Sequence, residues 1–162
     1  MSRGVLIAGV GNIFCGDDGF GCEVVRRLAD EPLPPGVAAV DYGIRGVHLV
    51  YDLLEGCPAL VLVDATPRGG RPGSVYVLEV GPDDLGEGSL DAHSMDPAAV
   101  LASLSSLGGT WPRTFVVGCE PAEIGEHIGL SPAATAAVDV AVSAVRELVA
   151  DELSLLGARE GT

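Results

Sequence analysis

Residues 4–19 read GVLIAGVGNIFCGDDG, and this stretch decides the fold. Its apolar run over residues 4–10 is typical of a strand that is covered on both faces. A glycine-containing turn follows, and residues 20–29 then show the period of an amphipathic helix. The apolar stripe of that helix consists of Phe20, Val24, Val25 and Leu28. A covered strand followed by such a helix predicts an α/β sheet with helices on both faces.

The rest of the chain repeats this alternation of strands and helices. We expect further strands over residues 37–41, 59–63, 74–79 and 114–118. We expect helices over about 47–55, 97–107 and 132–156, the last of them capped by Ser131 and stopped by Gly157. The pattern predicts an α/β three-layer sandwich with a mostly parallel, about five-stranded twisted sheet, in which strand 74–79 is an antiparallel edge strand. We expect one domain over residues 1–162, with the last few residues disordered.

Composition and charge exclude some classes of function. The 162 residues are 48% hydrophobic, which fits one folded domain with a sizeable core and excludes a disordered chain. Lys and Arg number 9 against 23 Asp and Glu, and the formal net charge of −14 disfavours binding to nucleic acid or to an anionic membrane. No apolar stretch approaches the roughly 20 residues that span a bilayer, and no segment resembles a signal peptide. We therefore expect a cytoplasmic protein and, by default, a monomer.

Acidic residues follow three of the expected strands. Asp17 and Asp18 lie in the turn after the first strand, Asp41 ends the second, and Asp64 ends the third. Ligands of open parallel α/β sheets collect beyond the carboxyl ends of the strands, so these acids are candidates for one shared site. Each has a simpler interpretation alone, since Asp17 or Asp18 could be a helix N-cap and Asp64 could open an Asx turn. Two adjacent acids in one tight turn nevertheless repel each other, and a bound cation would relieve that repulsion.

A metal site is one interpretation of these acids. His93 lies in an acidic loop over residues 81–96, and this loop could fold over the strand ends. Two carboxylates and one imidazole suit first-row divalent metals such as Ni²⁺ or Zn²⁺ and leave coordination positions open. A lone loop histidine is more often solvated than a ligand, however. His48 and His127 compete for the same role, although neither has an obvious strand-end partner.

A nucleotide site is a second interpretation, because Gly9-Val10-Gly11 follows a strand and precedes a helix. The dinucleotide fingerprint G-x-G-x-x-G is incomplete, since its sixth position is Phe14. Asp17 and Asp18 also occupy the place where a pyrophosphate would meet the helix N-terminus, and they would repel it. The acids therefore disfavour a dinucleotide site.

Several motifs occur in a fixed order along the chain. They are Gly9-x-Gly11-Asn12, Asp17-Asp18-Gly19-x-Gly21, Asp64 after an apolar strand, His93 before a helix, Gly118-Cys119-Glu120-Pro121, and Ile128-Gly129-Leu130-Ser131. This set, which runs from Gly4 to about Leu148, resembles the hydrogenase maturation proteases. The resemblance implies an endopeptidase that removes a short C-terminal extension from the precursor of the large subunit of nickel-iron hydrogenase after nickel has been inserted.

The resemblance also implies roles for individual residues. The metal-binding positions of the family fall on Asp18, Asp64 and His93, and we expect Asp18 and Asp64 to be catalytic as well. Nickel is expected to arrive with the substrate, whose cysteines would supply further ligands. The residues that we expect to bind the substrate are Asp41, Gly43 and Gly46.

Two ways of activating the attacking water remain open. The metal can polarise the scissile carbonyl or lower the pKa of a bound water. Alternatively, Asp18 or Asp64 can act as a general base, which would make the enzyme an aspartic-type endopeptidase. No H-E-x-x-H or G-x-S-x-G motif supports a separate zinc-protease or serine-hydrolase mechanism. The alternatives to a protease are a non-enzymatic metal-binding or chaperone module with the same site and a Rossmann-like nucleotide-binding domain.

Overall fold

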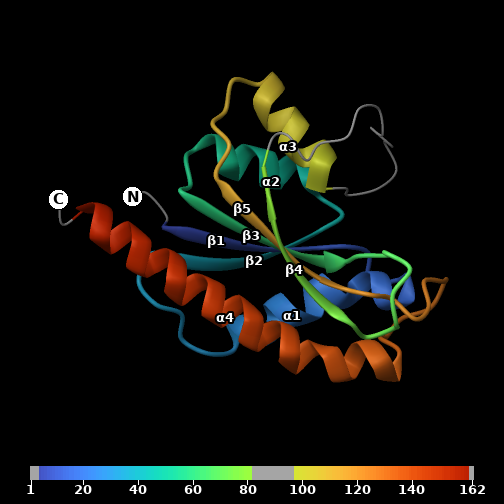
Figure 1. Cartoon of the computed structure of the whole chain (residues 1–162). Helices are drawn as coiled ribbons and strands as arrows, with labels where there is room; N and C mark the ends of the chain where they lie inside the picture. Colours follow the sequence, from blue (N-terminus) through green and yellow to red (C-terminus); the bar gives the residue numbers. More distant parts are fainter. Residues whose placement is uncertain (1–3, 82–96, 161–162) are drawn as a thin grey trace.

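Five strands form one sheet in the computed structural model, which describes residues 4–81 and 97–160 (Figure 1). The strands are β1 (Val5–Val10), β2 (Val37–Gly43), β3 (Ala59–Ala65), β4 (Val75–Val80) and β5 (Arg113–Cys119). Their order across the sheet is β2-β1-β3-β5-β4. The first four strands in this order pair in parallel, and β4 pairs with β5 in antiparallel fashion. The predicted mostly parallel sheet with an antiparallel edge strand is thereby confirmed.

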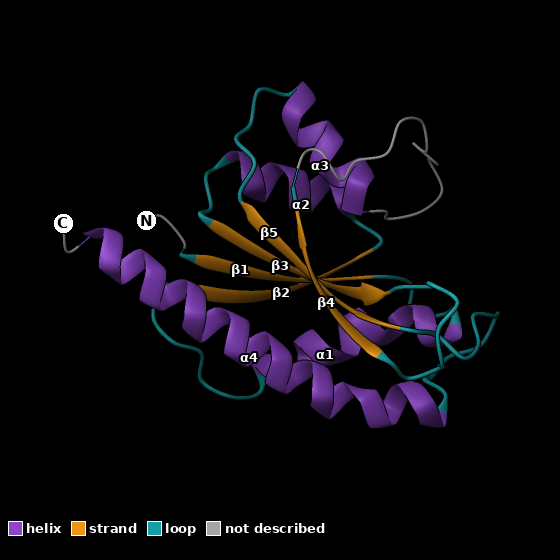
Figure 2. Cartoon of the chain, viewed as in Figure 1, coloured by secondary structure: helices purple, strands orange, loops and turns teal. Residues whose placement is uncertain are grey.

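Helices cover both faces of this sheet (Figure 2). The helices α1 (Phe20–Ala29) and α4 (Pro132–Glu160) lie against one face, and α2 (Gly46–Leu54) and α3 (Pro97–Ser106) lie against the other. Side chains of a strand alternate between its two faces, so β1 contributes to both cores. Val5 and Ile7 pack on the side of α1 and α4, whereas Leu6 and Ala8 pack on the side of α2 and α3. The three-layer α/β sandwich expected from the sequence is confirmed.

The last helix begins where we expect it and ends later. Ser131 caps α4, because its Oγ accepts the N–H of Ala134 at 3.2 Å. Gly157 does not stop the helix, which continues to Glu160, so this expectation is wrong. A glycine ends a helix by adopting a positive φ, and Gly157 is not among the glycines that do so. Residues 161–162, where we expect disorder, lie outside the described part of the chain. Although α4 is long, no helix in the described ranges is apolar enough over a sufficient length to cross a membrane.

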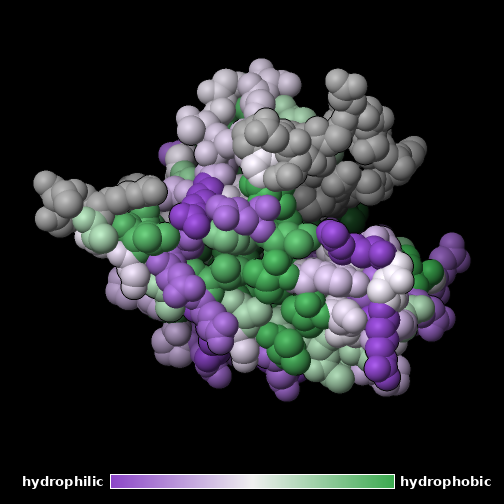
Figure 3. Space-filling view, in the orientation of Figure 1, coloured by the Kyte–Doolittle hydropathy of each residue, from purple (hydrophilic) through white to green (hydrophobic). Residues whose placement is uncertain are grey.

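The strand β4 forms one edge of the sheet. It runs antiparallel to β5, with Val75 opposite Cys119 and Val80 opposite Thr114. Its side chains are only partly covered, and Val77 is exposed. Figure 3 shows hydrophobic surface in the middle of the face drawn, over β4 and the neighbouring α4. The half-covered position of β4 explains the partial alternation of polar and apolar residues in its sequence.

Several loops leave the sheet at the carboxyl ends of its parallel strands, on the right in Figure 1. We call this side the carboxyl edge of the sheet. The loop after β1 contains the short 3-10 helix η1 (Gly16–Gly19) and leads into α1. The loops after β2, β3 and β5 leave from the same edge. Because β1 lies between β2 and β3, the strand order reverses here. In open α/β sheets this reversal marks the crevice where ligands bind.

The helix α1 approaches the sheet closely at Gly21. A Cβ built on Gly21 would lie 2.0 Å from the carbonyl oxygen of Val63 and 2.7 Å from that of Val10. A Cβ built on Gly9 of β1 would lie 2.6 Å from the carbonyl oxygen of Gly21. Packing therefore requires glycine at both positions, because any side chain would push α1 away from β1 and β3.

We expect Gly21→Ala to lower the free energy of unfolding by about 3 kcal/mol, because the added methyl group overlaps the backbone of β3. Gly157→Ala is the matched control, since a Cβ built on Gly157 would have no atom within 4 Å and the residue occupies a helix. The control should keep or raise stability by up to about 1 kcal/mol. Urea unfolding measures both effects, and equal stability of Gly21→Ala and the wild type would contradict the close approach.

Candidate active site

The dipeptide Gly11-Asn12 is the point at which the acid-bearing loops meet. The N–H of Gly11 donates to the carbonyl oxygen of Gly43 at 2.9 Å, which joins the turn after β1 to the end of β2. The N–H of Asn12 donates to Oδ2 of Asp18 at 2.9 Å. A Cβ built on Gly11 would lie 1.9 Å from the carbonyl oxygen of Asp18 and 3.6 Å from Oδ1 of Asp64. Both acids therefore lie against this glycine.

Gly11 is required for this arrangement. Its φ of 134° is a conformation that residues with a side chain rarely adopt. A side chain would also overlap the backbone of Asp18, which the turn brings back over Gly11. The carboxylate of Asp18 is half-buried and is oriented by the N–H of Asn12. The motif Gly9-x-Gly11-Asn12 thus holds a carboxylate. In a dinucleotide-binding turn the same place is left open for a phosphate.

The thiol of Cys22 shows that three acids are gathered here. Cys22 lies in the first turn of α1 and is 4% exposed, and its Sγ is 3.6 Å from the carbonyl oxygen of Gly11. Burial first, and then the carboxylates of Asp41, Asp64 and Asp18, raise the pKa of this thiol to about 12. Asp41 is in hydrogen-bond contact with this thiol, and Asp64 and Asp18 act on it through their charge. The three acids thus lie toward the carboxyl ends of β2 and β3 and in the turn after β1.

The loop between β2 and α2 is shaped by its own polar groups. Oδ1 of Asp41 accepts the N–H of Gly43 at 2.9 Å, and Gly43 has a φ of 57°. The guanidinium of Arg45 donates to the carbonyl oxygens of Asp41 and Tyr42, at 3.0 and 3.2 Å. Gly46 is the first residue of α2. The three residues expected to bind the substrate therefore lie in one braced segment at the carboxyl edge of the sheet.

Asp17 joins the turn after β1 to the loop after β5 by hydrogen bonds and is not a helix cap. The N-cap of α1 is Gly19, and no side chain caps either η1 or α1, so the N-cap interpretation of Asp17 and Asp18 is wrong. Asp17 is 1% exposed. Its carboxylate accepts four hydrogen bonds from the loop after β5: the N–H groups of Ala122 (2.8 Å), Glu123 (3.2 Å) and Ser131 (2.7 Å), and the Oγ–H of Ser131 (2.8 Å).

These four bonds also set the charge state of Asp17. Burial acts to raise the pKa of Asp17, but the hydrogen bonds from Ser131, Ala122 and Glu123 outweigh it and hold the pKa below its ordinary value. The carboxylate is therefore charged, and both of its oxygens accept hydrogen bonds that hold the loop after β5. This role separates Asp17 from its neighbour Asp18, which accepts an N–H from the turn after β1.

Glu120 is a positioning residue that the sequence analysis missed. It is 5% exposed, and its Oε1 accepts the N–H groups of Arg68 (2.9 Å) and Gly70 (2.7 Å) and the hydroxyl of Tyr76 (2.8 Å). Burial acts to raise the pKa of Glu120, but these hydrogen bonds hold it below its ordinary value. Glu120 thereby fixes the loop that follows Asp64. The Cys119-Glu120-Pro121 motif was the only signal of this role in the sequence.

The three histidines fall in different places. His93, which we expect to be the third metal ligand, lies outside the described residues. His48 is exposed on α2. His127 lies in the loop after β5, where its carbonyl oxygen accepts the N–H of Gly16 at 2.7 Å, and a Cβ on Gly16 would lie 2.8 Å from its Cε1. This loop therefore folds back onto η1, and in this contact His127 meets a glycine of η1 and not an acid at a strand end.

The groups around Gly11 suit a cation better than a phosphate. The N–H of Asn12, which could otherwise bind an anion, is already bound to the carboxylate of Asp18. Asp18 and Asp64 carry like charges in a half-buried setting, and a divalent cation would relieve their repulsion. Within residues 4–81 and 97–160, no three His, Cys, Asp or Glu side chains form a group that could hold a metal ion. Asp18 and Asp64 alone offer two carboxylates, which is fewer ligands than a divalent cation takes.

Comparisons with known proteins identify relatives of the chain. The family model described as HycI, hydrogenase maturation protease, matches residues 22–148. The chain is 34% identical over 149 residues to the hydrogenase expression/formation protein HupD of Rhodobacter capsulatus, which covers 89% of this chain and 70% of that protein. It is 29% identical to the hydrogenase 2 maturation protease of Escherichia coli over 87% of each. The solved structure of the hydrogenase maturating endopeptidase HybD from E. coli matches with a TM-score of 0.80 and 28% identity, over 92% of this chain and 93% of that chain.

We expect Cys22 to resist alkylation in the folded protein, because its thiol is buried and has a pKa of about 12. Iodoacetamide at about pH 8 should leave Cys22 unmodified while the half-buried Cys15 reacts. Mass spectrometry of the digested protein measures both sites, and the unfolded protein, in which both should react, is the control. Labelling of Cys22 as fast as Cys15 would contradict the enclosed position among the acids.

We expect Asp17→Asn to lower the free energy of unfolding by about 2–3 kcal/mol at neutral pH, because the new amide group would face N–H donors. A lowered pKa means that the charged form of Asp17 stabilises the fold above the pKa of the unfolded chain. This contribution is lost as the pH falls through the lower, folded-state pKa. The gap between wild type and variant in urea unfolding should therefore shrink below about pH 4. A gap that is absent at neutral pH, or equal at every pH, would contradict the role of Asp17.

Proposed function

The chain belongs to the hydrogenase maturation protease family and is a peptidase, and on that premise we propose that it removes the C-terminal extension from the precursor of a nickel-iron hydrogenase large subunit. We further propose that cleavage follows the insertion of nickel, so that the metal is part of the substrate. Family membership does not favour the alternatives of a non-enzymatic module or a nucleotide-binding domain.

One observation supports this proposal most directly. Asp18 and Asp64 both lie against Gly11, although 45 residues of chain lie between them, and the motif around Gly11 is one of those that resemble the family. We take these two neighbouring carboxylates as a pair of metal ligands that leaves coordination positions open for others. The site is thus suited to a metal that arrives with ligands of its own.

We propose that Asp18, Asp64 and His93 bind the nickel of the precursor. Carboxylate and imidazole donors form a ligand set without thiolate, which leaves coordination positions for cysteine thiolates of the precursor. Such a site binds the loaded precursor better than free metal, because the precursor supplies the missing ligands. Cleavage would then depend on the presence of nickel.

We propose that Asp18 or Asp64 accepts the proton of the attacking water, which makes the enzyme an aspartic-type endopeptidase. A general base has to lie within hydrogen-bond reach of the proton that it removes. The N–H of Asn12 orients the carboxylate of Asp18 for this task by holding its Oδ2. Bound nickel would supply Lewis acidity, which polarises a carbonyl or lowers the pKa of a water molecule.

The braced segment after β2 is the proposed contact for the precursor backbone. Asp41, Gly43 and Gly46 lie beside the turn that holds Asp18, because Gly43 accepts the N–H of Gly11. We also propose that the protein acts as a monomer in the cytoplasm. Its four cysteines are thiols and form no disulfide with one another, as is usual in a reducing compartment, and a net charge of −14 disfavours self-association.

The test is the cleavage of purified, nickel-loaded precursor by the wild type and by three variants. We expect Asp18→Asn, Asp64→Asn and His93→Ala each to lower the rate of cleavage by about 100-fold or more, because each removes a proposed metal ligand or base. Precursor without nickel should stay uncut. Mass spectrometry of the large subunit measures the loss of the extension.

Asp151→Asn is the matched control, because Asp151 is an exposed acid in the distal half of α4. This variant should cleave like the wild type, and thermal unfolding should show that all variants remain folded. A wild-type protein that binds the loaded precursor without cleaving it would overturn the proposed function. Full cleavage by any of the first three variants would remove that residue from the site.

A further inference from the structure

Large apolar side chains are exposed on the loops around the acids. Single exposed apolar residues are common in proteins, but a group of them around one site marks a binding surface. The group lies on the loops after β1, β2 and β5 and on the first turn of α2. We call it the apolar collar, and its members are Ile13, Phe14, Ile44, Val47, Ile124 and Ile128.

A groove joins two members of this collar to Asp41. It has a volume of about 430 Å³ and lies between η1, α1 and the residues that lead into α4. Ile13 and Ile128 line it from different loops, so apolar side chains from two parts of the collar face one space. Asp41 and Cys22 line the same groove. So do Gly16 and Gly19 of η1, which stand on either side of Asp17 and Asp18 in the chain. An occupant of the groove would therefore lie next to Asp41 and beside the turn that carries Asp18.

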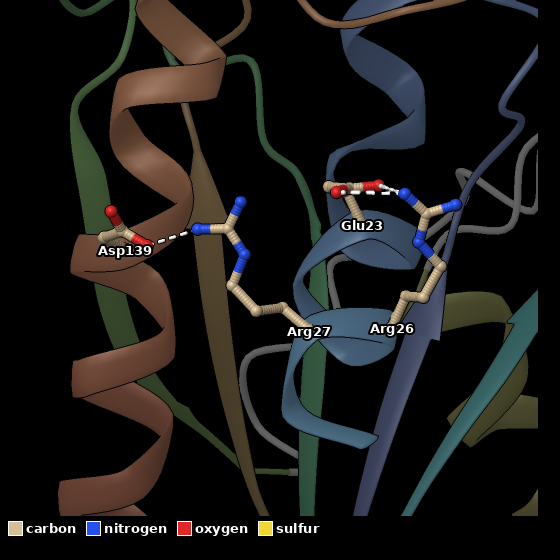
Figure 4. Close-up of polar contacts among 4 residues, drawn as sticks. All are labelled: Glu23, Arg26, Arg27 and Asp139. Carbon is tan, nitrogen blue, oxygen red and sulfur yellow. Dashed lines mark hydrogen bonds and ion pairs between the residues drawn. The ribbon is translucent and has the colours of Figure 1, made fainter. Parts of the chain in front are cut away.

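The charged side chains that line the groove already have partners. Arg26 pairs with Glu23 in the same helix at 3.0 Å, and Arg27 pairs with Asp139 of α4 (Figure 4). Figure 4 shows both arginines extending from α1 toward these carboxylates. Because each positive charge is balanced within the chain, the groove has little attraction for an acidic segment. It favours an uncharged, apolar one.

We propose that the groove and the apolar collar bind an extended, apolar segment of the precursor polypeptide next to the scissile bond. This inference rests on the proposed function and names the part of the substrate that the enzyme recognises besides nickel. Apolar side chains of the precursor would pack between Ile13 and Ile128 and against Ile44, and burying them favours binding. The scissile bond would thereby be held beside the carboxylates of Asp18 and Asp64.

A second copy of this chain is a poorer occupant. Ile13 and Ile128 of the collar line one groove with Asp41, beside the turn that carries Asp18, so two copies that met at this surface would bring their acids together. Each copy also carries a net charge of −14. Like charges that approach at an interface lower its affinity. A neutral segment of another protein avoids this repulsion.

The test compares steady-state cleavage of nickel-loaded precursor by the wild type, Ile128→Ser, Ile44→Ser and the double variant. Ile128 and Ile44 are 73% and 66% exposed, so replacing them leaves the core intact. We expect each single change to raise KM about tenfold with little change in kcat, and the double change to raise it further. Leu107→Ser is the matched control, because Leu107 is 59% exposed and lies just after α3, at the opposite edge of the sheet. It should keep the wild-type KM.

A binding measurement separates this inference from the proposed function. Asp64→Asn removes one proposed nickel ligand but keeps the groove and the collar, so this protein should still hold uncut precursor, and adding Ile128→Ser should weaken the remaining binding about tenfold. If the wild type cleaves the precursor and the collar variants keep its KM, the inference is overturned and the proposed function stands. If the wild type does not cleave, the proposed function fails, and unchanged binding after Ile128→Ser then overturns the inference as well. Light scattering measures the oligomeric state. A wild-type dimer that dissociates on Ile128→Ser would assign the collar to self-association and overturn the inference.

Discussion

The contact between Gly11-Asn12 and the loops around it is the constraint on which the site depends. Three carboxylates from β2, β3 and the turn after β1 repel one another, so they lie close together only if the backbone holds them there. Gly11 allows this because it has no side chain: the backbone of Asp18 passes over it, and Asp64 lies beside it. Its N–H donates to the carbonyl oxygen of Gly43, which fixes the end of β2, where Asp41 lies. The whole cluster therefore depends on one glycine at the point where the strand order reverses.

The buried and the half-buried acids perform different tasks. Asp17 and Glu120 are almost fully buried, and several N–H and O–H donors use their oxygens. Their lowered pKa values follow from those donors, and their task is to hold the loops after β5 and β3 in place. Asp18 and Asp64 are half-buried and lie at the crevice. A carboxylate that is oriented but still accessible can bind a cation or accept a proton, whereas one enclosed by donors cannot.

Most of the fold follows from local patterns in the sequence. Strands such as β1 and β3 are covered on both faces, so their apolar runs identify them directly. The end of α4 was not predictable in the same way, because Gly157 continues the helix where a positive φ would have ended it. The intrinsic tendency of a single glycine to end a helix is weak compared with the packing that holds α4 along the sheet.

The site was only partly predictable for a related reason. The gathering of Asp18, Asp41 and Asp64 follows from their positions at the ends of neighbouring parallel strands. The partners of Asp17 lie 105 to 114 residues further along the chain, and no local pattern indicates such contacts. Similarly, His127 lies against η1 because the loop after β5 folds back, which its own neighbours in the sequence do not reveal.

A crystal of this protein soaked with Ni²⁺ or Cd²⁺, examined by anomalous scattering, is the most direct test of the shared metal site. We predict one strong peak bonded to carboxylate oxygens of Asp18 and Asp64 and to a ring nitrogen of His93, at about 2.0–2.3 Å. A metal bound instead at His48 or His127, with His93 more than about 10 Å from the two carboxylates, would contradict it, since ligands of one ion must all lie within bonding distance.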